Sequence, residues 1–246
     1  MQSPGNRKVF LAGAAGVIGR RLVPLLLQRS WHVVGTTRST ERAKALAAAG
    51  AEPVVVDVFD APALERAVVA AQPSVVVHQL TDLPAGLDPA LMTEALSRNA
   101  RVRSVGTANL VAATLTARVP RIVAQSIAWA YAPQARPLRE EDPLDLQAEG
   151  MRAITVRGVA ELERCVLDSP PLAGVVLRYG RFYGPGTGAD ARGAPPVVHI
   201  DAAAWATVLA VERADPGIYN IAERCAYLAT DKARTKLEWN ADWRVS

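Results

Sequence analysis

The stretch FLAGAAGVIGRRL, Phe10–Leu22, decides the fold, because three glycines join an apolar strand pattern to a helical pattern. At such a junction one glycine permits a tight turn, one lets the backbone approach a pyrophosphate, and one lets the helix pack closely on the strand. The helix then directs its free N–H groups and the positive end of its dipole at the phosphates. The stretch therefore predicts a dinucleotide-binding turn whose contacts are Gly13, Ala15, Gly16, Val17, Ile18 and Gly19.

Short apolar runs alternate with longer helical patterns along most of the chain. The predicted strands are Lys8–Ala12, His32–Thr37, Glu52–Asp57, Ser74–Leu80, Arg121–Ser126 and Gly174–Gly180. They are rich in β-branched residues and almost continuously apolar, as strands covered by helices on both faces must be. The helical patterns between them are Val17–Arg29, Ser39–Ala49, Ala61–Ala71, Pro89–Ala117 and Met151–Leu167. This alternation predicts an α/β fold with a doubly wound parallel sheet of the Rossmann type.

The pattern loosens after Gly180. GPGTGADARGAPP (184–196) is typical of a loop, HIDAAAWATVLAVE (199–212) of a strand edge and a helix, and GIYNIA (217–222) of a short strand. A short helix, DKARTKLEW (231–239), follows. We therefore expect a Rossmann domain over residues 1–180 and a small C-terminal lobe over residues 181–246 that packs on its substrate side.

Composition and charge exclude several classes of function. The chain has 246 residues, and no apolar run reaches the roughly 18 residues that span a bilayer. Its 28 basic residues are scattered among 24 acidic ones, so neither a nucleic acid nor a membrane is an expected partner. Cys165 and Cys225 are isolated, which predicts reduced thiols and no metal site. We expect a cytoplasmic protein that binds a small-molecule substrate.

The end of the second predicted strand indicates which dinucleotide is bound. NAD-specific sites place an Asp or Glu there to bind the ribose 2′-OH, whereas this chain has Thr37, Arg38 and Ser39. A cation beside hydroxyl groups suits a 2′-phosphate, so we expect NADP rather than NAD. The alternative is that Arg38 is simply a solvated arginine. Asp57 ends the third predicted strand, where its carboxylate would bind the adenine amino group or cap the following helix.

Several segments recur together in one known family. They are GAAGVIG (13–19), VVVDVFD (54–60), VVVHQLTDL (75–83), VGTANLVAA (105–113), RIVAQSIAWAY (121–131), LRYGRFYGPGTG (177–188), VVHIDAAAWATVLA (197–210) and GIYNIA (217–222). In this order they resemble the extended short-chain dehydrogenase/reductases, the NAD-dependent epimerase/dehydratase family. The resemblance implies an NAD(P)-dependent oxidoreductase or epimerase/dehydratase-like enzyme acting on a small carbonyl or sugar-like substrate. It also implies cofactor contacts at Asp57, Val58, Leu80, Thr81, Arg103 and Ser126, and a homodimer paired through helices 89–117 and 151–167.

The chain departs from this family at the catalytic pair. The family transfers hydride with a Tyr-x-x-x-Lys pair on the helix after the fifth strand, but the corresponding helix here, MRAITVRGVAELERCVL (151–167), has neither residue. Two alignments to the family's helix glutamate remain open. Aligning Glu161 puts Arg157 at the lysine position, and aligning Glu163 puts Val159 there. Neither alignment restores the pair.

The segment RIVAQSIAWAYAP (121–133) supplies other candidate proton donors, Ser126 and Tyr131. Ser126 stands one position before Ile127, where the resemblance places the family's catalytic hydroxyl, and Tyr131 has no lysine four residues on. The structural alternatives are a buried serine hydroxyl bonded to backbone and a packed aromatic ring. Two functions therefore remain open: an atypical enzyme with a displaced proton donor, or an NADP-binding regulator or scaffold without turnover.

The chain is shorter than members of the family usually are near residues 190–196 and 224–230. Those places normally hold parts of the substrate-binding lobe. Either the lobe is reduced, or the sequence omits segments there.

Overall fold

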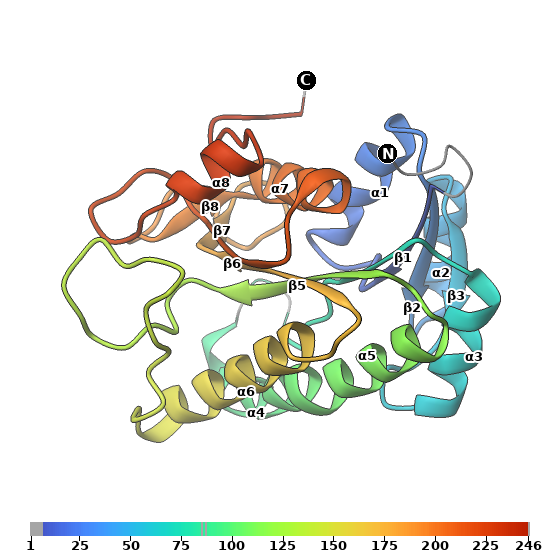
Figure 1. The fold of residues 1–246 in the computed structure, drawn as a ribbon, viewed down its shortest axis with the longest axis horizontal. Coiled ribbons are helices and arrows are strands. Elements are labelled where there is room, and N and C mark those ends of the chain that lie inside the picture. The colour runs from blue at the N-terminus through green and yellow to red at the C-terminus, as the bar shows by residue number, and fades with distance from the viewer. Residues whose placement is uncertain (1–6, 85, 87, 246) are drawn as a thin grey trace.

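The computed structural model describes residues 7–84, 86 and 88–245, and helices cover both faces of a central sheet (Figure 1). Seven strands form this sheet in the order β3-β2-β1-β4-β5-β6-β9, and each neighbouring pair is parallel. The strands are β1 (Lys8–Ala12), β2 (His32–Thr37), β3 (Glu52–Val55), β4 (Val75–His78), β5 (Arg121–Ile127), β6 (Ala173–Tyr179) and β9 (Gly217–Ile221). Because the strand order reverses between β1 and β4, a ligand-binding crevice is expected at the carboxyl ends of these two strands.

Two apolar layers hold the helices on the sheet. On one face lie α1 (Gly19–Gln28), α2 (Thr40–Ala48) and α7 (Ile200–Arg213), with Leu22, Leu46 and Leu209 in their core. On the other face lie α3 (Ala61–Ala71), α5 (Thr107–Thr116) and α6 (Gly150–Leu167), with Leu64, Leu110 and Leu162 in their core. Figure 1 shows α1 and α7 on one side of the strands and α5 and α6 on the other. The predicted doubly wound parallel sheet is confirmed.

The observed elements differ from the predicted ones mainly at their ends. β3 ends at Val55 rather than Asp57, and β4 ends at His78 rather than Leu80. The single helix predicted over residues 89–117 is wrong in one respect, because the π-helical turn η2 (Val102–Gly106) separates α4 (Pro89–Arg101) from α5. Single π-helical turns within helices occur often at functional sites.

The region after β6 is divided between the main sheet and a smaller unit. β9 and α7 complete the sheet and its cover, whereas β7 (Arg181–Tyr183) and β8 (Val197–His199) form a separate two-stranded sheet and α8 (Asp231–Lys236) follows β9. Part of the predicted lobe 181–246 is therefore built into the Rossmann sheet. The division at residue 180 stays a prediction. In the described part of the chain, no helix is both long and apolar enough to cross a membrane.

Candidate functional site

The glycine-rich turn has the geometry that a dinucleotide site needs. Gly13 has φ +91°, and a Cβ there would lie 2.7 Å from the carbonyl carbon and oxygen of Gln79, so a side chain is excluded. A Cβ on Gly19 would lie 2.3 Å from the Gly13 carbonyl oxygen, whereas one on Gly16 would meet only that oxygen, at 3.2 Å. The outer side of the turn is thus open, and α1 begins without a side-chain cap. The N–H groups of Arg20, Arg21 and Leu22 donate to backbone carbonyls. Among the described residues, those of Val17, Ile18 and Gly19 have no acceptor, so they are left for an anion, as a bound pyrophosphate requires.

The remaining predicted contacts of this turn are less open. Ile18 is buried in the core, and Ala15 and Val17 are half-buried. Backbone groups rather than side chains would therefore meet a ligand here.

The end of β2 presents an exposed cation, Arg38. Arg38 is exposed and forms no hydrogen bond or ion pair with any residue that the structure describes. The Oγ1 of buried Thr37 accepts a hydrogen bond from the Ser39 N–H, 3.2 Å away. The Ser39 hydroxyl in turn accepts from the Arg42 N–H and caps α2. The guanidinium therefore projects from a backbone that two hydroxyl groups hold in place.

Asp57 lies just beyond β3, at the predicted adenine position. One carboxylate oxygen accepts from the Phe59 N–H at 2.9 Å, which folds the backbone into a tight turn. The cap of α3 is Asp60, whose carboxylate accepts from the Ala63 N–H, so the helix-capping role considered for Asp57 is wrong. The next predicted contact, Val58, is buried.

His78 ends β4 and fixes the loop that follows. Its Nδ1 accepts from the Leu80 N–H at 3.2 Å, and its Nε2 lies 2.9 Å from the Thr107 hydroxyl oxygen. An accepting Nδ1 places the proton on Nε2, so the ring is neutral. Burial, helped by the charge of Arg103, lowers the pKa of His78 to about 4. Leu80, which is half-buried, and exposed Thr81 thus follow directly after an anchored residue.

Ser126 belongs to a buried ion-pair network. Its hydroxyl donates to Glu163 Oε1 at 2.6 Å, and Arg178 donates to both carboxylate oxygens, from Nε at 2.9 Å and from Nη2 at 2.6 Å. Their exposed fractions are 1% for Ser126, 5% for Glu163 and 3% for Arg178. The hydroxyl is bonded to a carboxylate rather than to backbone, the alternative that the sequence suggested.

The three tyrosines nearest the predicted active site are buried, and their hydroxyl groups are engaged. Tyr131 donates to Asn220, Tyr183 donates to Glu223, and the hydroxyls of Tyr179 and Thr207 share one hydrogen bond. Burial raises the pKa of Tyr131 to about 12. A phenol whose proton is committed and whose pKa is raised is a weak general acid at neutral pH. The roles of Tyr131 and Ser126 as proton donors stay predictions.

The two glutamates of α6 have different surroundings. Glu163 is buried and paired with Arg178, whereas Glu161 is exposed and pairs with Arg164 on the surface. This contrast favours the alignment on Glu163, which puts Val159 at the lysine position. Val159 is fully buried in an apolar cluster, so it brings no polar group to the site.

Unsatisfied polar side chains gather at the carboxyl ends of β4 and β5. Gln79 is 3% exposed, and neither of its amide atoms forms a well-aligned hydrogen bond with a described partner, although the side chain lies close enough to the Tyr179 hydroxyl to act on its pKa. Gln125 Oε1 likewise has no hydrogen-bond partner among the described residues. Because His78 pairs with Ala124, the next residues, Gln79 and Gln125, lie side by side on one face of the sheet. Arg103 is also buried, at 6% exposed. Buried polar groups are nearly always hydrogen-bonded, so these side chains are candidate ligand contacts.

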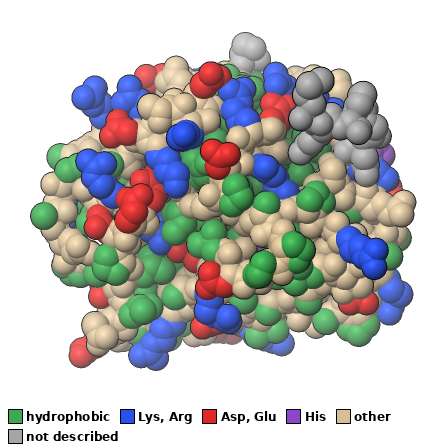
Figure 2. Space-filling view, in the orientation of Figure 1, with side chains coloured by type: hydrophobic (Ala, Val, Ile, Leu, Met, Phe, Trp, Pro, Cys, Tyr) green, Lys and Arg blue, Asp and Glu red, His purple; other side chains and the backbone are tan. Residues whose placement is uncertain are grey.

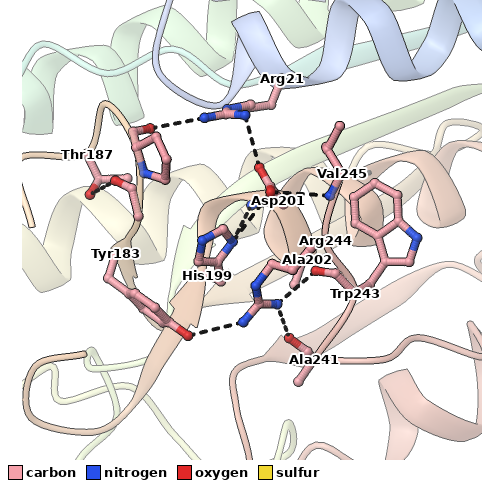
Figure 3. Close-up of polar contacts among 12 residues, drawn as sticks. Arg21, Tyr183, Thr187, His199, Asp201, Ala202, Ala241, Trp243, Arg244 and Val245 are labelled. Atoms are coloured by element: carbon pink, nitrogen blue, oxygen red, sulfur yellow. Dashed lines mark hydrogen bonds and ion pairs between the residues drawn. The ribbon is translucent and has the colours of Figure 1, made fainter. Parts of the chain in front are cut away.

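A second polar cluster joins α1, the β7–β8 pair and the C-terminal segment (Figure 3). Asp201 lies 3.3 Å from Arg21 Nη1, and its N–H donates to Nδ1 of His199, which caps α7. Arg244 donates to the Tyr183 hydroxyl at 3.3 Å. These contacts hold the C-terminal segment over the start of α7. The Tyr183 hydroxyl lies between the Glu223 carboxylate and the Arg244 guanidinium.

On the face drawn in Figure 2, Lys and Arg side chains are interspersed with Asp and Glu. Among the described residues, no group of three or more His, Cys, Asp or Glu side chains is placed to hold a metal ion.

Comparison with known proteins agrees with this geometry. A family model described as NAD(P)H-binding matches residues 13–183, from the glycine-rich turn to β7. A curated relative, the 3-diazoavenalumate denitrifying reductase of a Streptomyces species, is 41% identical over 253 aligned positions that cover 94% of this chain and 79% of the relative. Because 253 positions exceed the 246 residues of the chain, the alignment has gaps in this chain.

Solved structures share the fold at low sequence identity. The UDP-glucose 4-epimerase of Thermotoga maritima superposes with a TM-score of 0.74 at 18% identity, covering 96% of this chain and 94% of that one. The enzyme WbmG of Bordetella bronchiseptica, solved with NAD, gives a TM-score of 0.72 at 18% identity, covering 100% of this chain and 92% of that one.

The fold and the glycine-rich turn define an NAD(P)-binding Rossmann protein, and the reductase relative at 41% identity supports an NAD(P)-dependent enzyme of the oxidoreductase kind. The chain belongs to the NAD(P)H-binding family.

Sequence reasoning missed the two glutamines and the pairing of Glu163 with Arg178. A glutamine inside an apolar strand pattern, as in VVVHQL (75–80) and RIVAQS (121–126), was the available signal.

Proposed function

We propose that the protein is an NAD(P)H-dependent reductase that delivers a hydride to a small electrophile without a protein phenol as proton donor. The observation that carries the proposal is that Tyr131, Tyr179 and Tyr183 all have buried, hydrogen-bonded hydroxyl groups, while α6 contains no tyrosine and no lysine. Carbonyl reduction needs a proton on oxygen as the hydride arrives, so this site is poorly equipped for the carbonyl substrate that the family resemblance implies.

A diazo group on a small organic acid is an acceptor that fits such a site. The relative at 41% identity is named for the denitrifying reduction of a diazo acid anion. When bound, the cofactor would supply a hydride, which forms a C–H bond at a diazonium carbon while the C–N electron pair leaves with N2 and NAD(P)H becomes NAD(P)+. The leaving group needs no proton. The residues of this chain then have to bind the cofactor, orient the acid and exclude water.

In this proposal the predicted cofactor contacts bind and position NADPH. The turn would hold the pyrophosphate, exposed Arg38 the 2′-phosphate and Asp57 the adenine amino group. The preference for NADP over NAD rests on the unpaired guanidinium of Arg38 and on the absence of an acidic residue beside it. The full set is Gly13, Ala15, Gly16, Val17, Ile18, Gly19, Thr37, Arg38, Ser39, Asp57, Val58, Leu80, Thr81 and Ser126, with Arg103 considered separately below.

The hydroxyl groups of Ser126 and Tyr131 have a structural role in this proposal, because each donates its proton to another buried side chain. Ser126 would meet the cofactor through its backbone, which Ser126→Ala keeps. We expect Ser126→Ala and Tyr131→Phe to lower the melting temperature and leave kcat nearly unchanged. A loss of about 100-fold or more in kcat, with unchanged NADPH affinity, would instead identify the substituted residue as the proton donor.

The decisive experiment supplies NADPH deuterated at C4, on the face that is transferred, together with 3-diazoavenalumate carrying a 15N-labelled diazo group. We expect one N2 released per NADPH oxidised, with deuterium on the carbon that held the nitrogen. A parallel panel of carbonyl and sugar-nucleotide substrates tests the alternative chemistry.

Two results would contradict the proposal. Turnover of carbonyl or sugar substrates without turnover of diazo acids would show that the reaction is wrong. Failure to bind either NADPH or NADH would show that the cofactor site itself is wrong.

The homodimer implied by the family resemblance is also a proposal. Apolar side chains on α4, η2 and α6 support it, since Leu91 is 53%, Val105 44% and Met151 37% exposed. Light scattering on the purified protein tests it directly, and a monomer at micromolar concentration would refute it.

A further inference from the structure

Arg103 is a buried cation at the edge of the sheet where ligands of this fold bind. It lies in the π-helical turn η2 between α4 and α5 and is only 6% exposed. Its charge helps to lower the pKa of His78 at the end of β4, and the Glu163 carboxylate of α6 acts on it in turn. The guanidinium therefore lies near the ends of β4 and β5, because Glu163 is bonded to Ser126 of β5.

No anion in the described part of the chain pairs directly with Arg103, although the Glu163 carboxylate acts on it from a distance. Among residues 7–84, 86 and 88–245, none forms a hydrogen bond or an ion pair with its guanidinium. The oxygens of Glu163 already accept three hydrogen bonds, from Ser126 and from Arg178. The residues outside the described part, MQSPGN, Ala85, Leu87 and Ser246, include no Asp or Glu.

Such a residue is costly to the fold. Burial lowers the pKa of Arg103 to about 10, so the side chain still carries its charge at neutral pH. A buried charge without a partner destabilises a protein strongly, and an apolar side chain of similar size is often better tolerated. An unpaired buried arginine beside a ligand crevice is therefore expected to have its partner in the ligand.

The cofactor has no anionic group at this end of the crevice. Its pyrophosphate belongs at the N-terminus of α1, after β1, and its adenosine half belongs along β2 and β3. The nicotinamide half would then extend toward β4 and β5, and in NAD(P)H both its ring and its ribose are uncharged. An anion that reaches Arg103 must come from the substrate.

We propose that Arg103 binds the carboxylate of the substrate and makes the site selective for organic acids. This inference rests on the proposed reductase function, because it assigns the substrate to the nicotinamide end of the crevice. A planar guanidinium pairs with a carboxylate through two parallel hydrogen bonds, which would orient the acid as well as bind it.

The first test measures stability without a ligand. Arg103→Met removes the charge and keeps an unbranched apolar side chain, so we expect the melting temperature of the ligand-free protein to rise by roughly 2 °C or more. Arg101→Met is the matched control, because Arg101 is exposed and two residues away, and its melting temperature should not rise. A fall in the melting temperature of Arg103→Met by several degrees would show that the fold itself satisfies the charge, and would overturn the proposal.

The second test measures binding and needs no turnover. Isothermal titration of the NADPH-loaded protein compares 4-hydroxycinnamate, an acid, with 4-hydroxycinnamamide, its uncharged analogue. We expect the acid to bind at least tenfold more tightly, and this preference to vanish in Arg103→Met and Arg103→Gln but to survive in part in Arg103→Lys. The affinity for NADPH should be the same in all four proteins.

The outcomes separate this proposal from the reductase function. Equal binding of acid and amide by the natural protein, or no binding of the acid at millimolar concentration, would overturn the role of Arg103. A loss of NADPH affinity in Arg103→Met would reassign the residue to the cofactor. Acid-selective binding without any denitrifying turnover would keep the carboxylate site and reject the proposed reaction.

Discussion

The buried pair of Glu163 and Arg178 gives the sharpest stability prediction. Glu163→Gln keeps the size of the side chain but removes its charge and leaves the guanidinium of Arg178, 3% exposed, without a counter-ion. The new amide nitrogen also cannot accept one of the three hydrogen bonds that the carboxylate accepts from Ser126 and Arg178. Breaking a buried pair on one side costs about 3–5 kcal/mol. At roughly 2–4 °C per kcal/mol for a chain of this size, the melting temperature should fall by roughly 6–20 °C.

The same helix supplies the control. Glu161→Gln removes an exposed carboxylate that pairs with Arg164 on the surface, and such pairs contribute about 0–1 kcal/mol. Urea unfolding of both variants, followed by circular dichroism, compares the two free energies of unfolding directly. A loss below about 1 kcal/mol in Glu163→Gln, or equal losses in the two variants, would refute the reasoning, because the buried pair would then behave as a surface pair.

Three further predictions concern the glycine turn, the cofactor preference and the pH dependence. Gly13→Ala should lower the free energy of unfolding by at least about 2 kcal/mol and abolish NADPH binding, because φ is +91° and the new Cβ would lie 2.7 Å from the Gln79 carbonyl. Thermal melts measure the first effect and fluorescence titration with NADPH the second. Arg38→Gln should weaken NADPH binding at least tenfold and leave NADH binding unchanged; equal losses for both cofactors would contradict the 2′-phosphate assignment. The pKa of His78 is about 4 in the folded protein, against an ordinary value of 6.5. As pH falls, the unfolded chain therefore binds a proton at this residue before the folded protein does. The free energy of unfolding should fall between pH 6.5 and 4, by up to about 3 kcal/mol. His78→Gln should flatten this loss, whereas substitution of exposed His32 should not.

The fold could be predicted because its signals are local and repeated. The strand pattern of residues 8–12, the three glycines and the following helix describe one complete β–α unit, and later strands repeat the same pattern. The alternation of strands with helices and the handedness of the crossovers then leave few topologies open. The π-helical turn at Val102–Gly106 could not be predicted in this way, because it extends a hydrogen-bonded helix by a change of one residue in register and leaves no break in the apolar pattern.

The candidate site was predictable only where function depends on backbone. Gly19 excludes a Cβ because of contacts within its own turn, and Gly13 does so through its positive φ and the approach of Gln79 from β4. The glycine pattern of the turn signals both positions, although the contact with Gln79 is itself long-range. From the sequence, Ser126 was a candidate acid with a free hydroxyl. Its partner, Glu163, is 37 residues away on another element, so nothing in the sequence indicated that the hydroxyl is engaged. The same limit applies to Tyr131, whose hydroxyl meets Asn220 only because β9 returns to the sheet beside β6. Long-range pairing of this kind decides whether a polar side chain is free to act.

The polar groups at the carboxyl edge fall into two sets with different consequences. Ser126, Glu163 and Arg178 satisfy one another, so removing one of them exposes the others to an unpaired, buried state. Arg103 has no hydrogen-bonded or ion-paired partner among the described residues, and the amide atoms of Gln79 have no well-aligned hydrogen bond there, so their cost in the ligand-free protein is already present. A substitution in the first set should lower stability whether or not a ligand is bound. An apolar substitution in the second set should not lower the stability of the ligand-free protein and should reduce only the extra stability that a bound ligand gives. Comparing melting temperatures with and without NADPH and acid therefore separates residues that hold the fold together from residues that bind the substrate, before any turnover has been measured.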